Sequence, residues 1–145
     1  MNEDCDRAQS FERELLVPSF VCDFGWFGGH PILRFSNKNF PNEVWLGMSG
    51  GFQVTPSPVL SETLTSRQRD LLLLESTYGY EVKSIRCYPN SRLEVLFTNE
   101  TLLTALDDDA DQYECWEMRT DHGGLIVASH GGGYAIWPSA TTRAV

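Results

Sequence analysis

Residues 80–106 decide the fold, and they read "YEVKSIRCYPNSRLEVLFTNETLLTAL". Leu93, Val95 and Phe97 occupy alternate positions, which is the period of a β-strand that buries one of its faces. The turn-forming residues "PNS" and "NE" separate this strand from apolar segments on both sides. The stretch therefore predicts three antiparallel strands connected as a meander.

The same pattern recurs on both sides of this meander. Aromatic residues are frequent, with eight Phe, five Tyr and four Trp, and such large side chains are typical of a β-rich core. The sequence therefore predicts an α+β fold that is mostly antiparallel β, as one continuous sheet or as two packed sheets. The further predicted strands are residues 20–27, 31–35, 43–48, 51–55, 113–119, 125–129 and 134–137.

Residues 65–77 form the one predicted helix. Thr65 is followed three residues later by Gln68, which is the spacing of a capping box, and Gly79 supplies a stop signal. Because its apolar residues fall on one face at helical spacing, we expect this helix to cover a sheet and to bury its leucines. These residues are Leu64, Leu71, Leu74 and Tyr78.

The chain has 145 residues, which corresponds to a single domain. Residues 1–16 are predicted to form a polar lead-in with some helical tendency around "SFERELL" (10–16), and residues 138–145 a flexible tail. Residues 55–63, "TPSPVLSET", contain two prolines and are interpreted as a linker across the fold.

The termini and the cysteines indicate a cytoplasmic protein. The beginning, "MNEDCDRAQSFERELL", is acidic and lacks the basic start and apolar core of a signal peptide. No apolar run approaches the length of a membrane span. The cysteines at positions 5, 22, 87 and 115 have no metal-ligand spacing, so we expect reduced thiols and neither a metal nor another cofactor.

Two pieces of the chain resemble later pieces in the same order, which raises an internal duplication as one interpretation. "LRFSNKNF" (33–40) resembles "VLFTNETL" (95–102), and "EVWLGMSGGFQV" (43–54) resembles "ECWEMRTDHGGLIV" (114–127). A duplication would make Trp45 and Trp116 equivalent core anchors. The alternative is that unrelated hairpins reuse Phe, Asn and Gly in the same roles.

The net charge of −9 is concentrated in the stretch 100–121, which has eight acidic residues and one basic residue. Nucleic-acid binding is disfavoured, because phosphates require Lys and Arg. A concentrated negative charge favours a basic protein partner and faster encounter with it.

The acidic run does not match a calcium loop. Asp107, Asp109 and Asp111 have the spacing of the first three ligands of an EF-hand, but Gln112 and Met118 replace the required glycine and glutamate. Glu114 and Glu117 are three positions apart on a predicted strand, so they are expected to point to opposite faces. They are therefore a poor pair for acid–base catalysis.

A surface for a protein partner is the remaining functional interpretation of this run, in which Tyr113 supplies an aromatic anchor. The competing interpretation is a solvated loop that precedes a core residue, Trp116. The candidate partner-binding residues are Asp107, Asp108, Asp109, Asp111, Tyr113, Glu114 and Glu117.

The histidines give an enzymatic alternative. His30, His122 and His130 all lie next to Gly-Gly turns, and turns at one end of a sheet could bring them together as metal ligands or a base. No ligand spacing such as HxxH supports this arrangement.

Five segments within residues 71–137 resemble a pattern found in small, uncharacterised bacterial proteins: "LLLLESTYGYEVKSI", "LEVLFTNETLL", "DQYECWEMR", "HGGLIVAS" and "GGGYAIW". In size, acidity and lack of catalytic motifs, the chain is similar to immunity proteins of bacterial toxin systems. That resemblance implies binding to a toxin domain, such as a basic nuclease.

The leading hypothesis is therefore a non-enzymatic immunity protein that neutralises a toxin through an acidic surface. Two alternatives stay open: a small-molecule or metal-dependent enzyme that uses the histidine turns, and a structural or assembly subunit. The oligomeric state is left open.

Overall fold

The computed structural model describes residues 3–37, 40–106, 114–121, 123–129 and 131–137. Two helices and ten strands lie within these ranges. In chain order they are α1 (Glu3–Leu16), β1 (Phe20–Phe27), β2 (His30–Asn37), β3 (Phe40–Gly47), β4 (Phe52–Thr55), α2 (Ser66–Glu75), β5 (Val82–Cys87), β6 (Leu93–Phe97), β7 (Leu102–Ala105), β8 (Glu114–Thr120), β9 (Leu125–Ser129) and β10 (Gly133–Trp137).

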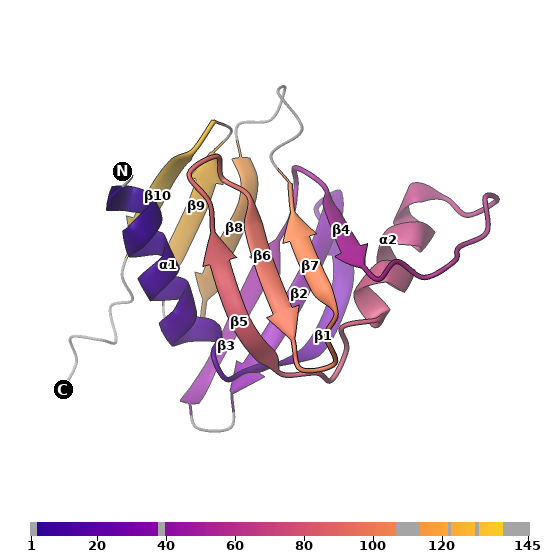
Figure 1. The fold of residues 1–145 in the computed structure, drawn as a ribbon, viewed down its shortest axis with the longest axis horizontal. Coiled ribbons are helices and arrows are strands. Elements are labelled where there is room, and N and C mark those ends of the chain that lie inside the picture. The colour runs from indigo at the N-terminus through magenta and orange to yellow at the C-terminus, as the bar shows by residue number, and fades with distance from the viewer. Residues whose placement is uncertain (1–2, 38–39, 107–113, 122, 130, 138–145) are drawn as a thin grey trace.

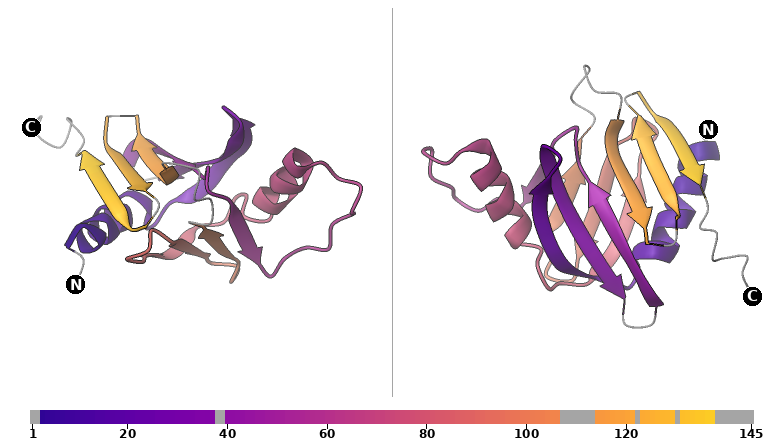
Figure 2. Two further views of the ribbon diagram at one scale, coloured as in Figure 1. Left: turned by 90° about the horizontal axis from the view of Figure 1, so that it is seen from above. Right: turned by 180° about the vertical axis from the view of Figure 1, so that it is seen from behind.

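The strands form two antiparallel sheets that pack face to face (Figures 1 and 2). One sheet has six strands in the order β1-β2-β3-β8-β9-β10, and the other has four in the order β4-β7-β6-β5. The chain leaves the six-stranded sheet after β3, builds the whole four-stranded sheet, and returns as β8. The predicted α+β, mostly antiparallel fold is confirmed, in its two-sheet form.

The quoted stretch forms the meander β5-β6-β7, as predicted. Leu93, Val95 and Phe97 are fully buried, because their alternation turns all three toward the other sheet. Every other strand predicted from the sequence is also present, with bounds that differ by at most a few residues.

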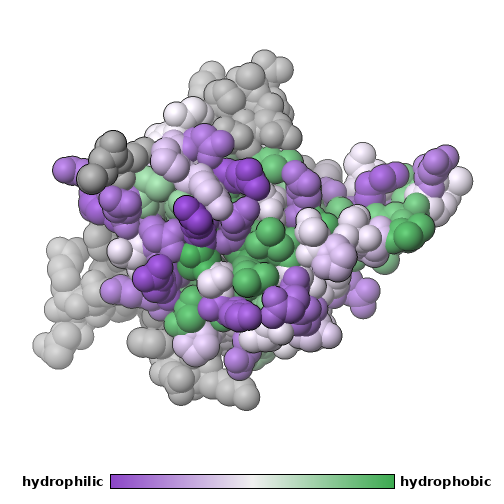
Figure 3. All heavy atoms as spheres, in the orientation of Figure 1, coloured by the Kyte–Doolittle hydropathy of each residue, from purple (hydrophilic) through white to green (hydrophobic). Residues whose placement is uncertain are grey.

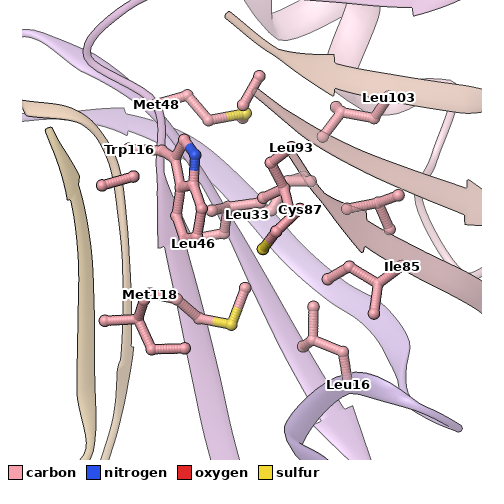
Figure 4. Close-up of a cluster of buried hydrophobic side chains, with 14 of the residues drawn as sticks. Leu16, Leu33, Leu46, Met48, Ile85, Cys87, Leu93, Leu103, Trp116 and Met118 are labelled. Atoms are coloured by element: carbon pink, nitrogen blue, oxygen red, sulfur yellow. The ribbon is translucent and has the colours of Figure 1, made fainter. Parts of the chain in front are cut away.

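Trp116 of β8 lies in the core between the two sheets and is fully buried (Figure 4). Its indole Nε1 donates a hydrogen bond of 2.7 Å to the backbone oxygen of Ser91, in the turn between β5 and β6. Its ring also meets Tyr134 of β10 edge to face, with centroids 6.0 Å apart. The indole nitrogen of Trp116 therefore has a hydrogen-bond partner although it is buried, and this hydrogen bond links the two sheets.

Helix α2 has the predicted capping box. The Thr65 hydroxyl accepts a hydrogen bond from the Gln68 backbone N–H at 3.1 Å, and the Gln68 side chain accepts one from the Thr65 N–H at 2.9 Å. The helix lies beside the sheets rather than over a sheet face (Figure 1). Only Leu74 of its leucines is fully buried, and Tyr78 is exposed, so the predicted burial of this face holds only in part.

Residues 3–16 differ from the predicted polar lead-in, because they form a helix that is part of the core. Cys5, Ala8, Glu12 and Leu16 recur every three or four positions, and all four are buried. The Gln9 side chain anchors the helix to β5: it donates to the Ile85 oxygen and accepts from the Cys87 N–H at 2.6 Å. Figure 1 shows α1 alongside β5 and β10.

Trp45 and Trp116 are not equivalent core anchors, contrary to the duplication hypothesis. Trp45 lies between the buried residues Val44 and Leu46, so it points to the opposite side of its sheet and is only half-buried. The connections differ as well. The stretch 43–54 crosses from β3 into the second sheet, whereas 114–127 is a hairpin within one sheet.

None of the four cysteines forms a disulfide, in agreement with the predicted reduced thiols. Within the described ranges, no helix has both the length and the apolar character needed to cross a membrane. The predicted tail, residues 138–145, lies outside those ranges.

Candidate protein interface

Five of the seven predicted binding residues lie outside the described ranges: Asp107, Asp108, Asp109, Asp111 and Tyr113. The other two, Glu114 and Glu117, are on β8, an interior strand of the six-stranded sheet. In the chain, β8 begins directly after residue 113, and Leu106 is fixed by a hydrogen bond of 3.0 Å from its N–H to the Gly51 oxygen.

Glu114 and Glu117 lie on the same face of the sheet, contrary to the prediction. The register pairs Glu114 with Ser129 and Glu117 with Val127, while the buried Trp116 pairs with the buried Ala128. A β-bulge between Glu114 and Trp116 inserts one extra residue and reverses the alternation. Both carboxylates are consequently on the outer side of the sheet, away from the core.

This outer face of the six-stranded sheet is not covered by either helix (Figure 2, right). Helix α1 contacts β5 and β10, and α2 contacts β1, β2 and β4. The strand registers place a series of apolar side chains on the face, and the exposed Trp137 lies at its β10 edge. These apolar residues are Ile32, Trp45, Leu125, Val127, Ala135 and Trp137.

A pocket of about 490 Å³ opens on this face. Two of its lining side chains lie over glycines: a Cβ atom at Gly25 would lie 2.4 Å from the Phe27 ring, and one at Gly47 would lie 3.0 Å from His30 Nε2. Phe27 therefore folds over one glycine, and His30 over the other. The pocket is lined by Phe27, Gly28, His30, Ile32, Trp45, Gly47, Glu117 and Arg119.

Charged pairs flank the aromatic residues of the face. Arg119 Nη2 lies 2.6 Å from Glu117 Oε1, and Arg34 contacts both Asp23 and Glu43 at 3.8 Å. Trp45 is in register with Arg34 on one side and with Arg119 on the other. Such solvent-accessible pairs contribute little to stability, so their partners can be exchanged when another protein binds.

The opposite outer face, on the four-stranded sheet, has a different character. Its cross-strand row of Arg86, Glu94, Thr104 and Gln53 is polar, and Leu96 and Leu102 are half-buried at its centre. Figure 3 shows this face as largely hydrophilic around a small apolar centre. The two faces therefore provide an internal comparison for binding experiments.

The sequence did not identify Phe27, Trp45 and Trp137 as surface residues. "EVWLGM" is apolar at consecutive positions, so its alternation does not reveal which side chains face outward. The exposure of Phe27, at 62%, follows from its place at the end of β1, where the chain turns at Gly28 and Gly29. The position of Gly25 and Gly47 on either side of Ile32 depends on strand register.

The histidine hypothesis rests on residues that are only partly described. His30 lines the pocket, whereas His122 and His130 lie outside the described ranges. In the part of the chain that the structure describes, no group of three or more His, Cys, Asp and Glu side chains could hold a metal ion.

A second cluster of titratable groups is buried beneath α1. Glu12 is fully buried; Cys87 Sγ lies 2.5 Å from its Oε2, and its Oε1 has no hydrogen-bond partner. Burial raises the pKa of Glu12 from 4.5 to about 8, so this carboxyl is protonated at neutral pH. Burial also raises the pKa of the Cys87 thiol and that of the Tyr134 hydroxyl, which donates to the Tyr88 oxygen. This cluster thus supports the packing of α1 in an uncharged form.

No protein-family model, curated protein or solved structure matches this chain. The functional interpretation therefore depends on the surface chemistry described above.

Proposed function

We propose that the protein is a non-enzymatic binding protein whose interface is the outer face of the six-stranded sheet together with the adjoining acidic stretch. One observation carries this proposal: exposed aromatic side chains and carboxylates share a sheet face that no helix covers. Aromatic anchors surrounded by polar side chains are characteristic of the centres of protein–protein interfaces.

The charge of the region supports a basic protein as the partner. The four carboxylates on the described part of the face, Asp23, Glu43, Glu114 and Glu117, outnumber the guanidinium groups of Arg34 and Arg119. The stretch that enters β8 adds Asp107, Asp108, Asp109 and Asp111. Opposite charge accelerates encounter and fixes orientation, and phosphate-rich nucleic acid is disfavoured.

Within this class, we propose an immunity protein that neutralises a bacterial toxin domain, such as a basic nuclease, in the cytoplasm. The small size, the acidity and the resemblance of residues 71–137 to small bacterial proteins support this assignment. Inhibition would follow from covering the basic surface that such a toxin uses for its substrate.

Capture of the partner from a lysate of the native cell, followed by calorimetry at low and high salt, tests the acidic part of the interface. Changing Asp107, Asp108 and Asp109 to lysine should weaken binding strongly at low salt and reduce its dependence on salt. The matched control reverses Glu62, Glu75 and Glu81, which are exposed elsewhere, and so changes the net charge equally. An equal loss in both variants, or none in either, would contradict an acidic interface at this position.

A further inference from the structure

We propose that the pocket between Phe27 and Trp45 binds an arginine side chain of the partner. This inference rests on the proposed function, and it specifies which chemical group the face recognises. It uses described residues only, and its experiment does not require the partner.

The walls of the pocket match the hydrocarbon part of an arginine. Phe27 is 62% exposed, and Trp45 and Ile32 are half-buried, so all three present apolar surface to the opening. The stem of an arginine can lie along such surface while its charged end stays in a polar environment. Its planar guanidinium also stacks favourably on aromatic rings, and tryptophan is the strongest of these.

The polar end of the pocket holds a carboxylate. Glu117 is on the strand next to Gly47, and its Cγ lies 3.7 Å from the position of a Cβ added there. Arg119 Nη2 lies 2.6 Å from Oε1 of Glu117, and a carboxylate can accept about four hydrogen bonds. A second guanidinium can therefore bind Glu117 without first displacing Arg119.

Glycine at two positions seats two of the rings that line the pocket. Gly25 and Gly47 flank Ile32 across three neighbouring strands, because Gly25 pairs with Ile32 and Ile32 pairs with Gly47. A side chain at Gly47 would displace His30, and one at Gly25 would displace Phe27. These two glycines therefore let the Phe27 and His30 rings lie close against the sheet, where both rings line the pocket.

Titration of isotope-labelled protein with three small probes, followed by amide chemical shifts, tests this inference. The probes are N-acetyl-arginine amide, its neutral counterpart N-acetyl-citrulline amide, and N-acetyl-lysine amide. We expect arginine to shift the amides of Phe27, His30, Gly47 and Glu117, with citrulline binding roughly tenfold more weakly because it lacks the charge-assisted hydrogen bond. The lysine probe should bind with an affinity between those of the other two, because its ammonium group is not planar and cannot stack on the aromatic rings.

Three variants assign the effect to the pocket. Glu117→Gln should abolish the preference for arginine over citrulline, whereas Trp45→Ala should weaken binding of both probes. Trp137→Ala, on the same face but outside the pocket, should change neither, and the rest of each spectrum reports whether the variant is folded.

Equal binding of arginine and citrulline, or a preference for arginine that survives in Glu117→Gln, would overturn the inference. Absence of shifts at the pocket amides up to the solubility limit of the arginine probe would also overturn it. None of these results decides the proposed function, which is tested separately by partner binding to the variant with lysine at positions 107, 108 and 109.

Discussion

At the scale of single residues, Glu12 is the most unusual side chain in the described structure. A fully buried carboxyl with one unpartnered oxygen is costly to ionise, and the raised pKa of about 8 expresses that cost. The folded state therefore keeps a proton that the unfolded chain releases above pH 4.5. The contribution of Glu12 to stability is fully present below about pH 4.5 and is lost as the pH rises through about 8.

Glu12→Gln should remove this pH dependence. Relative to the variant, the wild type should lose on the order of 1 kcal/mol of unfolding free energy per pH unit between these two values, and the difference should level off above them. Urea unfolding between pH 5 and pH 9 measures the slope. Glu14→Gln, an exposed change on the same helix, serves as the control. A slope that is unchanged in Glu12→Gln would mean that Glu12 is not protonated in the folded protein.

Two tryptophans test the assignment of faces. Trp116→Ala should destabilise the protein by about 3–5 kcal/mol, because it leaves a cavity between the sheets and removes the hydrogen bond to Ser91. Trp45→Ala should cost only about 1 kcal/mol, since its side chain is half-buried on the outer face. Urea unfolding of both variants measures the difference. Comparable losses would place both residues in the core and would revive the duplication hypothesis.

At the scale of elements, the strands could be predicted from the sequence, whereas α1 gave only a helical tendency around residues 10–16 and no sign of its burial. Alternating side chains such as Leu93, Val95 and Phe97 reveal a strand directly, because the pleat has a period of two. The buried stripe of α1 contains a glutamate and a cysteine, so its periodicity is hidden from a hydrophobicity pattern. Helix α2 could be predicted because its capping box is a local signal.

The candidate interface could be predicted only in part, for a similar reason. The acidic stretch is a property of composition, and it is visible in the sequence. Glu114 and Glu117 share a face because a β-bulge adds one residue between Glu114 and Trp116. The spacing of the two glutamates in the sequence does not reveal this extra residue. The pocket depends on the pairing of β3 with β8, which is distant from β1, β2 and β3 in the chain.

The attachment of α1 to β5 gives a prediction at this scale. Gln9→Ala should leave the Cys87 N–H and the Ile85 oxygen without their side-chain partner, and destabilise the protein by about 1–3 kcal/mol. Amide hydrogen exchange should accelerate at Cys87 more than at Val95, which lies in the next strand. Unchanged exchange at Cys87 would show that Gln9 does not hold the helix against the sheet edge.

At the scale of the whole molecule, the two sheets have different roles. Their inner faces form one core around Trp116, and α1 and α2 protect the sides of the sandwich. The outer face of the four-stranded sheet is mainly polar, whereas that of the six-stranded sheet holds Phe27, Trp45 and Trp137 beside carboxylates. This asymmetry is the physical basis of the proposed function.

The most direct test of that function compares one truncation on each outer face, using the partner captured from the native cell. Calorimetry should show that Trp45→Ala weakens binding about tenfold or more, because a central aromatic anchor is lost. Leu96→Ala, a half-buried change on the four-stranded sheet, should leave the affinity unchanged. Full affinity in Trp45→Ala together with a loss in Leu96→Ala would place the interface on the opposite face and contradict the account.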